Sequence, residues 1–323
     1  MFLSVFDMFK VGVGPSSSHT IGPMVAGARF LDHLRQQPFK VAGLRVTLHG
    51  SLAFTGVGHA TDRASILGLA GFRADDYDAE KAEAELARIA AEGTVAPEGL
   101  PVLEFPPKEH LVFDYGPNLP GHANGMIIKG VDAQGDVITQ VTYYSVGGGF
   151  ILTEEELAAG KDHDDGPPVP FPFKSAKEML DMAAESGLTV ADMKRKNELS
   201  RRKGADLDAG IARIWEVMNT CINRGLENDG ILPGGLKVKR RAKGIHQSLL
   251  AERGMNLSAP HTINDWMSTY AMAVNEENAA GGQVVTAPTN GAAGVIPATI
   301  RYWLDHVPGA TVSKVPDFLL TAA

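Results

Sequence analysis

A run of hydroxyl and imidazole side chains lies close to the N-terminus, in the segment Gly14-Pro15-Ser16-Ser17-Ser18-His19-Thr20. Apolar residues follow it at the spacing of an amphipathic helix, namely Ile21, Met24, Val25, Ala28 and Leu31. Serine and threonine oxygens cap the free N–H groups of a helix start, and the same N–H groups can hold a carboxylate or a phosphate. A capped surface helix explains one such hydroxyl, whereas three serines and a histidine also suit a binding site.

A second candidate lies in a Gly-rich turn, residues 50–62, which follows a predicted strand at residues 44–50. Glycine lets the backbone approach a ligand closely, although the glycine spacing here is not that of a dinucleotide-binding loop. The turn contains His59, and an imidazole with an ordinary pKa of about 6.5 can act as a base near neutral pH. A structural histidine is the alternative, and the sequence leaves both open.

The N-terminal half mixes helix and strand patterns. Residues 121–126 carry His122 and Asn124, and their Asn-Gly pair is a turn of the hairpin type that leads into a strand at residues 126–131. Alternating side chains over residues 136–146 indicate another strand. This half therefore predicts an α+β domain whose strands can pair antiparallel.

The C-terminal half is predicted to be helical. Composition becomes polar and then proline-rich over residues 153–174, which is typical of a linker. We expect an α+β domain over residues 1–152 and a helical domain over residues 175–323. Two polar stretches of the helical domain, around His261 and Asn290, stand among small residues that permit either a polar pocket or a crowded helix crossing.

Composition limits the class of protein. The chain has 323 residues, of which 44% are hydrophobic and 21% charged, as in soluble globular proteins. The net charge is −8 without a basic domain, so we expect no nucleic-acid partner, and no apolar run is long enough to span a membrane. The N-terminus lacks the basic segment of a signal peptide. The one cysteine, Cys221, excludes an internal disulfide, fits a reducing cytoplasm and cannot hold an iron–sulfur cluster by itself.

These motifs together resemble those of bacterial L-serine dehydratases of the single-chain, iron–sulfur type. The resemblance follows the whole chain in order, through residues 14–20, the turn around His59, and residues 121–126, 232–242 and 286–297. It implies an N-terminal α+β domain, similar to the allosteric substrate-binding domain of some phosphoglycerate dehydrogenases, followed by a helical catalytic domain. The implied reaction converts L-serine to pyruvate and ammonia with a [4Fe-4S] cluster as Lewis acid, without pyridoxal phosphate. It further implies a cytoplasmic homodimer that serves amino-acid catabolism and gluconeogenesis.

The resemblance also suggests roles for single residues. We expect His59 to be the catalytic base, because its Gly-x-Gly surroundings can place an imidazole at a cleft between domains. The predicted substrate-binding residues are Ser16, Ser18, His19, Thr20, His122, Asn124, His261 and Asn290. Many relatives have proline where this chain has Ala123, a change that leaves the polar side chains on either side.

A larger departure from the family pattern concerns the end of the chain. The cluster cysteines of the family lie beyond the point that corresponds to Ala323, and residues 315–323 have the pattern of a helix without a C-cap. We therefore expect a truncated enzyme that is inactive and binds no cluster by itself.

Two alternatives stay open at this point. A pyridoxal-dependent dehydratase would carry a lysine adduct that borohydride traps. A serine-sensing regulatory module would bind serine through residues 1–150 without turnover. Neither has a sequence motif of its own in this chain.

Overall fold

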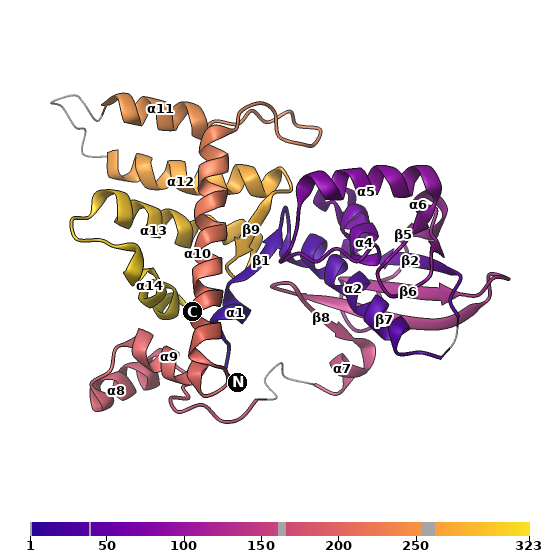
Figure 1. Ribbon diagram of the computed structural model, residues 1–323, viewed down its shortest axis with the longest axis horizontal. Coiled ribbons are helices and arrows are strands. Elements are labelled where there is room, and N and C mark those ends of the chain that lie inside the picture. Colours follow the sequence, from indigo (N-terminus) through magenta and orange to yellow (C-terminus); the bar gives the residue numbers. More distant parts are fainter. Residues whose placement is uncertain (1, 39, 161–165, 253–261) are drawn as a thin grey trace. The chain divides into compact units, whose positions relative to one another are not determined.

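The computed structural model describes residues 2–38, 40–160, 166–252 and 262–323 (Figure 1). The chain forms two compact units. The α/β unit comprises Gly12–Lys161 and Asn278–Gln283, and the helical unit comprises Met1–Val11, Asp162–Glu277 and Val284–Ala323. Strands β1 (Lys10–Val13) and β9 (Gln283–Thr286), through which the border between the units runs, pair in a small two-stranded sheet.

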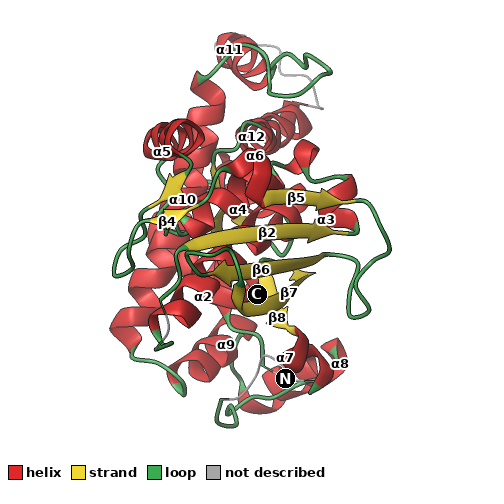
Figure 2. Cartoon of the chain, turned by 90° about the vertical axis from the view of Figure 1, so that its right-hand side faces the viewer, coloured by secondary structure: helices red, strands yellow, loops and turns green. Residues whose placement is uncertain are grey.

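A seven-stranded sheet forms the centre of the α/β unit (Figure 2). Its path runs β3-β4-β2-β6-β7-β8, and β5 pairs with β2. The bounds are β2 Gly43–His49, β3 Thr94–Val95, β4 Leu103–Glu104, β5 Leu111–Asp114, β6 Gly125–Val131, β7 Val137–Gly147 and β8 Phe150–Thr153. Strand β2 is parallel to β4 and β5, whereas the β2-β6-β7-β8 ladders are antiparallel.

Helices cover one face of this sheet. Helix α2 (Gly22–Arg35) packs on β6, β7 and β8, and α4 (Thr61–Leu69) packs beside α2. The apolar core between them includes Phe30, Leu44 and Ile128, none of which is exposed. Helix α5 (Ala79–Glu92) packs on α4. The remaining short helices are α3 Ser51–Phe54, α6 Pro107–His110 and α7 Glu154–Ala158.

Alternation along the strands leaves the other face of the sheet more polar. Arg45 is exposed on β2 between the buried Leu44 and Val46, and Lys129 of β6 and Gln140 of β7 continue this row across the sheet. A period of two is expected for a sheet with one solvated face.

A long central helix organises the helical unit. Helix α10 (Gly204–Glu227) buries an apolar stripe that includes Ile211, Ile214, Met218 and Cys221. Helices α11, α13 and α14 pack against it (Figure 1). The helices besides α10 are α1 Val5–Met8, α8 Ala176–Ser186, α9 Val190–Leu199, α11 Ala242–Glu252, α12 Thr262–Ala279, α13 Val295–His306 and α14 Val315–Ala322.

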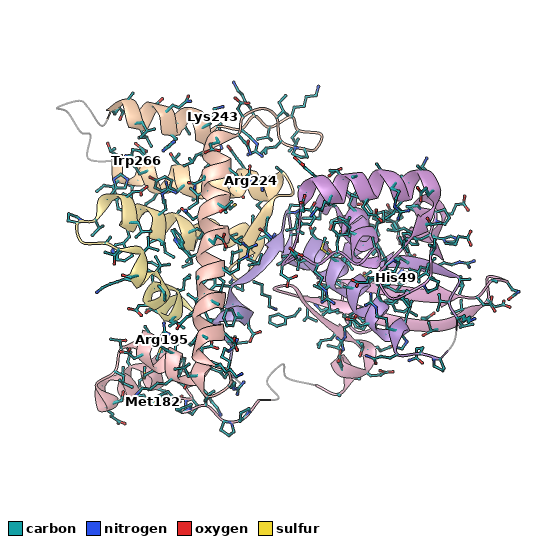
Figure 3. The ribbon with its side chains drawn as sticks, viewed as in Figure 1. His49, Met182, Arg195, Arg224, Lys243 and Trp266 are labelled. Carbon is teal, nitrogen blue, oxygen red and sulfur yellow. The ribbon has the colours of Figure 1, made fainter. Side chains whose placement is uncertain are left out.

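Buried carboxylates tie segments of the helical unit together. Glu198 on α9 is fully buried and accepts hydrogen bonds from Ser4 Oγ (2.9 Å) and Val5 N (2.6 Å). The Oε1 of Glu277 on α12 accepts a hydrogen bond from Nη1 of Arg240 (2.6 Å). The Oε2 of Glu277 lies 3.5 Å from Nε of Arg224, which is labelled on α10 in Figure 3. Buried charges need such partners because removal from water is costly.

The structure confirms the fold class, an α+β region followed by helices. The expected hairpin at Asn124-Gly125 is wrong, because β6 pairs with β2 and β7 and not with the preceding strand β5. Asn124 is instead bonded to the end of β7, where its side-chain amide donates to the carbonyl oxygen of Ser145 (3.1 Å).

Candidate functional site

The Ser-rich run forms a single π-helical turn, Ser17–Ile21, directly before α2. Ser16 caps this turn, since its hydroxyl accepts from the backbone N–H of His19 (3.2 Å) and its carbonyl accepts from Ile21 N (3.1 Å). Isolated π turns inside helices occur frequently at functional sites. The cap predicted from the sequence is confirmed, whereas the π turn is not visible in the sequence.

The segment before the turn is held by Asn278, near the end of α12, and by Gly282, between α12 and β9. The N–H of Gly14 donates to Gly282 O (3.0 Å), and Asn278 Nδ2 donates to Pro15 O (3.0 Å). A Cβ atom at Gly14 would lie 1.9 Å from Asn278 O, so only glycine fits this close approach.

His19 lies between two serine hydroxyls within the α/β unit. Its Nδ1 is 2.8 Å from Ser18 Oγ and its Nε2 is 2.8 Å from Ser51 Oγ, at the start of α3. Burial, and next to it the charge of His59, lowers the pKa of His19 below its ordinary value. His19 is therefore neutral at neutral pH and brings no positive charge to the cluster.

His59 stands beside this ring, with ring centroids 4.8 Å apart. Its Nδ1 is 2.9 Å from Thr55 O, and a carbonyl oxygen can only accept, so the hydrogen of neutral His59 sits on Nδ1. The lone pair is then on Nε2, for which the described residues offer no hydrogen-bond partner. The hydroxyl of Thr20 donates to the His59 carbonyl (2.7 Å) and holds this segment against the π turn.

The loop that carries His122 and Asn124 is bonded to the same cluster through Ser145. The Ser145 hydroxyl, buried at the end of β7, donates to Ser18 O (2.7 Å), and its carbonyl accepts from Asn124. The Nδ1 of His122 accepts from Asn124 N (3.1 Å), so the loop also bonds to itself.

A close backbone approach completes the arrangement at Gly50. This residue has a φ of 55°, and a Cβ there would meet Ala123 O at 2.3 Å. Ser51 N donates to the same carbonyl (2.8 Å). The positive φ and the contact both require glycine, and they place the start of α3 against the 122–124 loop.

The structure thus gathers most of the predicted site residues in one part of the α/β unit, namely Ser16, Ser18, His19, Thr20, His59, His122 and Asn124. The sequence reasoning missed Ser51 and Ser145, which join these segments. Both positions carry a signal, since each serine stands at a glycine-rich strand end. Asn290 belongs to the helical unit, where it is buried in a short 3₁₀ turn. His261 lies outside the described residues.

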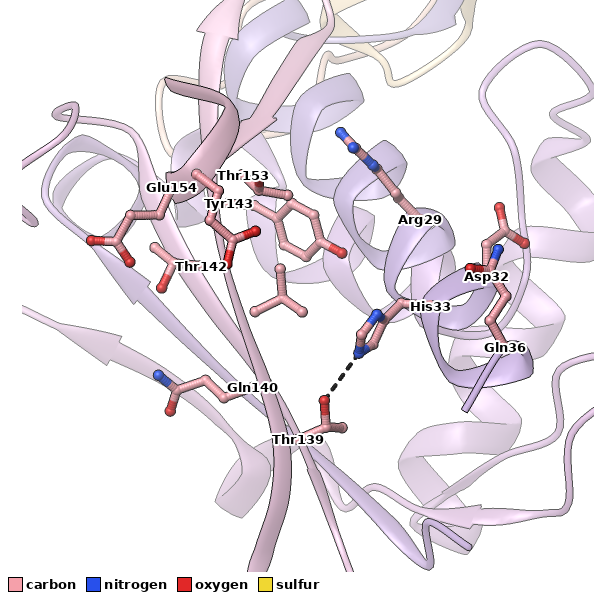
Figure 4. Close-up of a pocket in the computed structure, with 12 residues that line it drawn as sticks. Arg29, Asp32, His33, Gln36, Thr139, Gln140, Thr142, Tyr143, Thr153 and Glu154 are labelled. Atoms are coloured by element: carbon pink, nitrogen blue, oxygen red, sulfur yellow. Dashed lines mark hydrogen bonds between the residues drawn. The ribbon is translucent and has the colours of Figure 1, made fainter. Parts of the chain in front are cut away.

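A separate groove of about 650 Å³ lies between α2, β7 and the start of α7 (Figure 4). Arg29, Asp32 and His33 line it on the helix, and Thr139 and Tyr143 line it on the strand. None of the predicted site residues lines this groove.

The implied iron–sulfur cluster would need thiolate ligands, and the chain has one cysteine, Cys221. Cys221 is 2% exposed, and burial raises its pKa to about 12, so it remains a protonated thiol in an apolar core. Within the described ranges, no three His, Cys, Asp or Glu side chains are grouped to hold a metal ion. Because iron–sulfur clusters are held by thiolates, the described residues do not fit a [4Fe-4S] cluster.

Comparison with known proteins identifies the family. A family model described as serine dehydratase beta chain matches residues 4–156, and one described as serine dehydratase alpha chain matches residues 185–323. The chain is 44% identical to the L-serine dehydratase of Streptomyces coelicolor, over 100% of this chain and 70% of that protein. The chain belongs to the L-serine dehydratase family. It is also 44% identical to L-serine dehydratase TdcG of Escherichia coli (93% of this chain, 66% of that protein) and 39% identical to the Haemophilus influenzae L-serine dehydratase (99% and 70%).

Membership of the L-serine dehydratase family assigns the chain to the lyases. Both halves match parts of such an enzyme, so neither the pyridoxal-dependent alternative nor the sensing module is favoured. The histidine cluster lies within residues 4–156, the part that matches the beta-chain model. No helix in the described ranges is long and apolar enough to cross a bilayer.

Proposed function

We propose that this chain takes part in the chemistry of an L-serine ammonia-lyase, in which water is eliminated from L-serine to give, finally, pyruvate and ammonia. The relatives that match the chain from end to end are named L-serine dehydratases. The observation that carries the proposal for the site is the pair of imidazoles His19 and His59, 4.8 Å apart and surrounded by hydroxyl groups.

His59 is the base of the proposed reaction. Its Nε2 removes the proton from Cα of serine, and the electron pair forms the Cα–Cβ double bond as the Cβ–O bond breaks. The products are aminoacrylate and water, and the aminoacrylate tautomerises to an imine that a second water hydrolyses to pyruvate and ammonia. The contact between Nδ1 and Thr55 O supports Nε2 as the basic nitrogen of His59. Because His19 is neutral, it adds no positive charge beside the proton that His59 takes from serine.

The substrate would be held by the start of the π turn and its neighbours. Serine presents a carboxylate, an ammonium group and a hydroxyl, so its pocket needs both donors and acceptors. The N–H groups at the helix start supply donors for the carboxylate, and the oxygens of Ser16, Ser18 and Thr20 supply acceptors for the ammonium. The other predicted contacts are His19, His122, Asn124, His261 and Asn290.

Departure of the hydroxyl group requires a proton or a Lewis acid at its oxygen. The family resemblance implies a [4Fe-4S] cluster for this role, but the described residues do not fit one, and we assign this step to none of them. We further propose that the enzyme is a cytoplasmic homodimer that acts in amino-acid catabolism and gluconeogenesis.

The test is an anaerobic assay of the natural full-length protein, before and after reconstitution with iron and sulfide. The expected result is formation of pyruvate and ammonia in equal amounts from L-serine. Binding of serine without turnover would instead support the sensing module. A lysine adduct trapped by borohydride would support the pyridoxal-dependent enzyme, and either result would overturn the proposal.

A further inference from the structure

One peptide bond near the N-terminus links the end of helix α12 to the segment that carries His59. The carbonyl oxygen of Pro15 accepts a hydrogen bond from Nδ2 of Asn278 (3.0 Å). The N–H group of the same peptide belongs to Ser16 and donates to Oγ1 of Thr20 (3.1 Å). The Thr20 hydroxyl in turn donates to the carbonyl oxygen of His59 (2.7 Å). These contacts form a continuous series, which we call the Asn278 chain.

Each member of the Asn278 chain fixes the direction of the next hydrogen bond. A hydroxyl group has one hydrogen and two lone pairs, and the N–H of Ser16 occupies one lone pair of Thr20. The hydrogen of Thr20 must then point elsewhere, and the carbonyl oxygen of His59 is the acceptor that it meets. Hydrogen bonds in series also polarise and strengthen one another. Loss of the first donor, Asn278, therefore weakens the bond that reaches His59.

The two side chains of the Asn278 chain are buried. Thr20 is 3% exposed and Asn278 is 6% exposed. Solvent water does not readily replace a lost partner at such positions, and a buried polar group that loses its partner is costly. The segments that the chain joins are therefore held in one arrangement.

Asn278 is itself held in place by its backbone. It lies in the last turn of α12, and its carbonyl oxygen accepts from Gly281 N (3.1 Å). A Cβ at Gly14 would collide with the same oxygen, so the backbone of residue 14 passes directly over it. The N–H of Gly14 is bonded to Gly282 O. The end of α12 thus grips the segment before the π turn through both its backbone and the Asn278 side chain, although Pro15 is 263 positions away.

His59 depends on such an anchor because its own turn has little packing. It ends a short 3₁₀ turn, Val57–His59. Val57 is 71% exposed, and a Cβ at Gly58 would meet no atom within 4 Å. The bond from Thr20 to the His59 carbonyl ties this exposed turn to the buried start of α2.

We propose that Asn278 is a positioning residue for the base of the reaction. Through the Pro15–Ser16 peptide and Thr20, it holds the backbone of His59 where the imidazole can reach Cα of serine. No contact of Asn278 with the substrate is needed for this role. An error of about 1 Å in the placement of reacting groups can lower a rate about 100-fold. The inference rests on the proposed function of His59 as the base.

Gln283 offers a matched control for Asn278. Its side-chain amide comes from the same segment and also donates to a backbone carbonyl, that of Asp75 (3.4 Å), which is not part of the Asn278 chain. Alanine removes the amide in either variant and is well tolerated at the end of a helix. A role of Asn278 in stability alone would make Asn278→Ala and Gln283→Ala alike in turnover.

The kinetic test uses the natural full-length protein under anaerobic conditions. We expect Asn278→Ala to lower kcat at least about tenfold and Gln283→Ala to retain the wild-type kcat. KM should change less than about twofold, because the hydroxyl of Ser16 still caps the π turn and Ser145 still holds Ser18 O. Equal kcat values of the two variants, or a rise in KM alone, would overturn the proposal.

A double-mutant cycle tests whether Asn278 acts through Thr20. Thr20→Val keeps the shape of the side chain but removes the hydroxyl, so the double variant Asn278→Ala/Thr20→Val should have the same kcat as Thr20→Val. Thr20→Ser restores the hydroxyl and should recover most of the wild-type kcat. Should Asn278→Ala not fold, Asn278→Asp keeps the shape and, as a carboxylate, cannot donate, so it should lower kcat in the same way. Losses of kcat that multiply in the double variant would overturn the proposal.

Hydrogen exchange measures the anchoring without reference to activity. In full-length Asn278→Ala, the backbone amides of residues 56–61 should exchange at least about tenfold faster than in the wild type, whereas Gln283→Ala should leave them unchanged. Wild-type exchange rates in Asn278→Ala, with slow turnover by His59→Ala, would overturn this inference alone. Wild-type turnover by His59→Ala would overturn the proposed role of His59 and, with it, the catalytic part of this inference.

Discussion

Two polar clusters of this molecule differ in how completely their groups are paired. In the helical unit, the buried carboxylate of Glu198 accepts from Ser4 and Val5 and lies 3.1 Å from Arg202 Nε. In the α/β unit, one ring nitrogen of His59 contacts a backbone carbonyl, and the described residues give the other ring nitrogen no hydrogen-bond partner. A buried group whose polar atoms all have partners stabilises the fold. A group that keeps one polar atom without a partner, and that its other contacts hold in place, can react.

The largest effect should come from breaking the paired cluster. Glu198→Ala leaves Arg202 without its ion-pair partner and the start of α1 without its acceptor, and removing one partner of a buried pair costs about 3–5 kcal/mol. The free energy of unfolding, measured by urea titration, should fall by that amount. Glu216→Ala removes an exposed carboxylate paired with Arg213 on α10 and should cost below about 1 kcal/mol. Equal decreases in the free energy of unfolding for the two variants would show that Glu198 stabilises the fold no more than an exposed carboxylate does.

A smaller and different effect should follow in the partly paired cluster. Ser18→Ala removes a hydroxyl that contacts His19 and that we assign to the substrate, so KM for L-serine should rise about tenfold, equivalent to about 1.4 kcal/mol. The melting temperature should change little, because Ser16 supplies the cap. Ser16→Ala is the matched variant and should cost about 1 kcal/mol of stability. A lower melting temperature with an unchanged KM in Ser18→Ala would make Ser18 a structural residue.

The smallest effect concerns an ion pair beside neither cluster. Arg29 donates to Glu156 at 2.5 Å and thereby lowers the pKa of this carboxyl from 4.5 to about 2. A carboxyl whose pKa is lower in the folded state stabilises the fold above its unfolded pKa, and this contribution is lost as the pH falls from about 4.5 to 2. Arg29 is 41% exposed, so Glu156→Gln should cost only about 0.5–1 kcal/mol at pH 7 and nothing near pH 2. Glu155→Gln, on the same helix, should show no such pH dependence.

The sequence was sufficient for local features and insufficient for contacts between distant residues. The cap at Ser16 and the helix after it follow from residues a few positions apart. The contact between His19 and Ser51 spans 32 positions, and the one between Ser145 and Ser18 spans 127, so no local pattern encodes them. The incorrect prediction of a hairpin at Asn124-Gly125 has the same cause. Strand β6 pairs with β2, which lies far away in the sequence, and with β7, and the turn residues do not encode this pairing.

The central claim is that His59 removes the Cα proton of serine. The most direct measurement compares pyruvate formation by the wild-type full-length protein and by His59→Ala under identical anaerobic conditions. We predict a fall in kcat of at least about 100-fold, the usual scale for loss of a general base, with little change in melting temperature because the side chain of His59 is only half-buried. A kcat close to the wild-type value in His59→Ala would contradict the account.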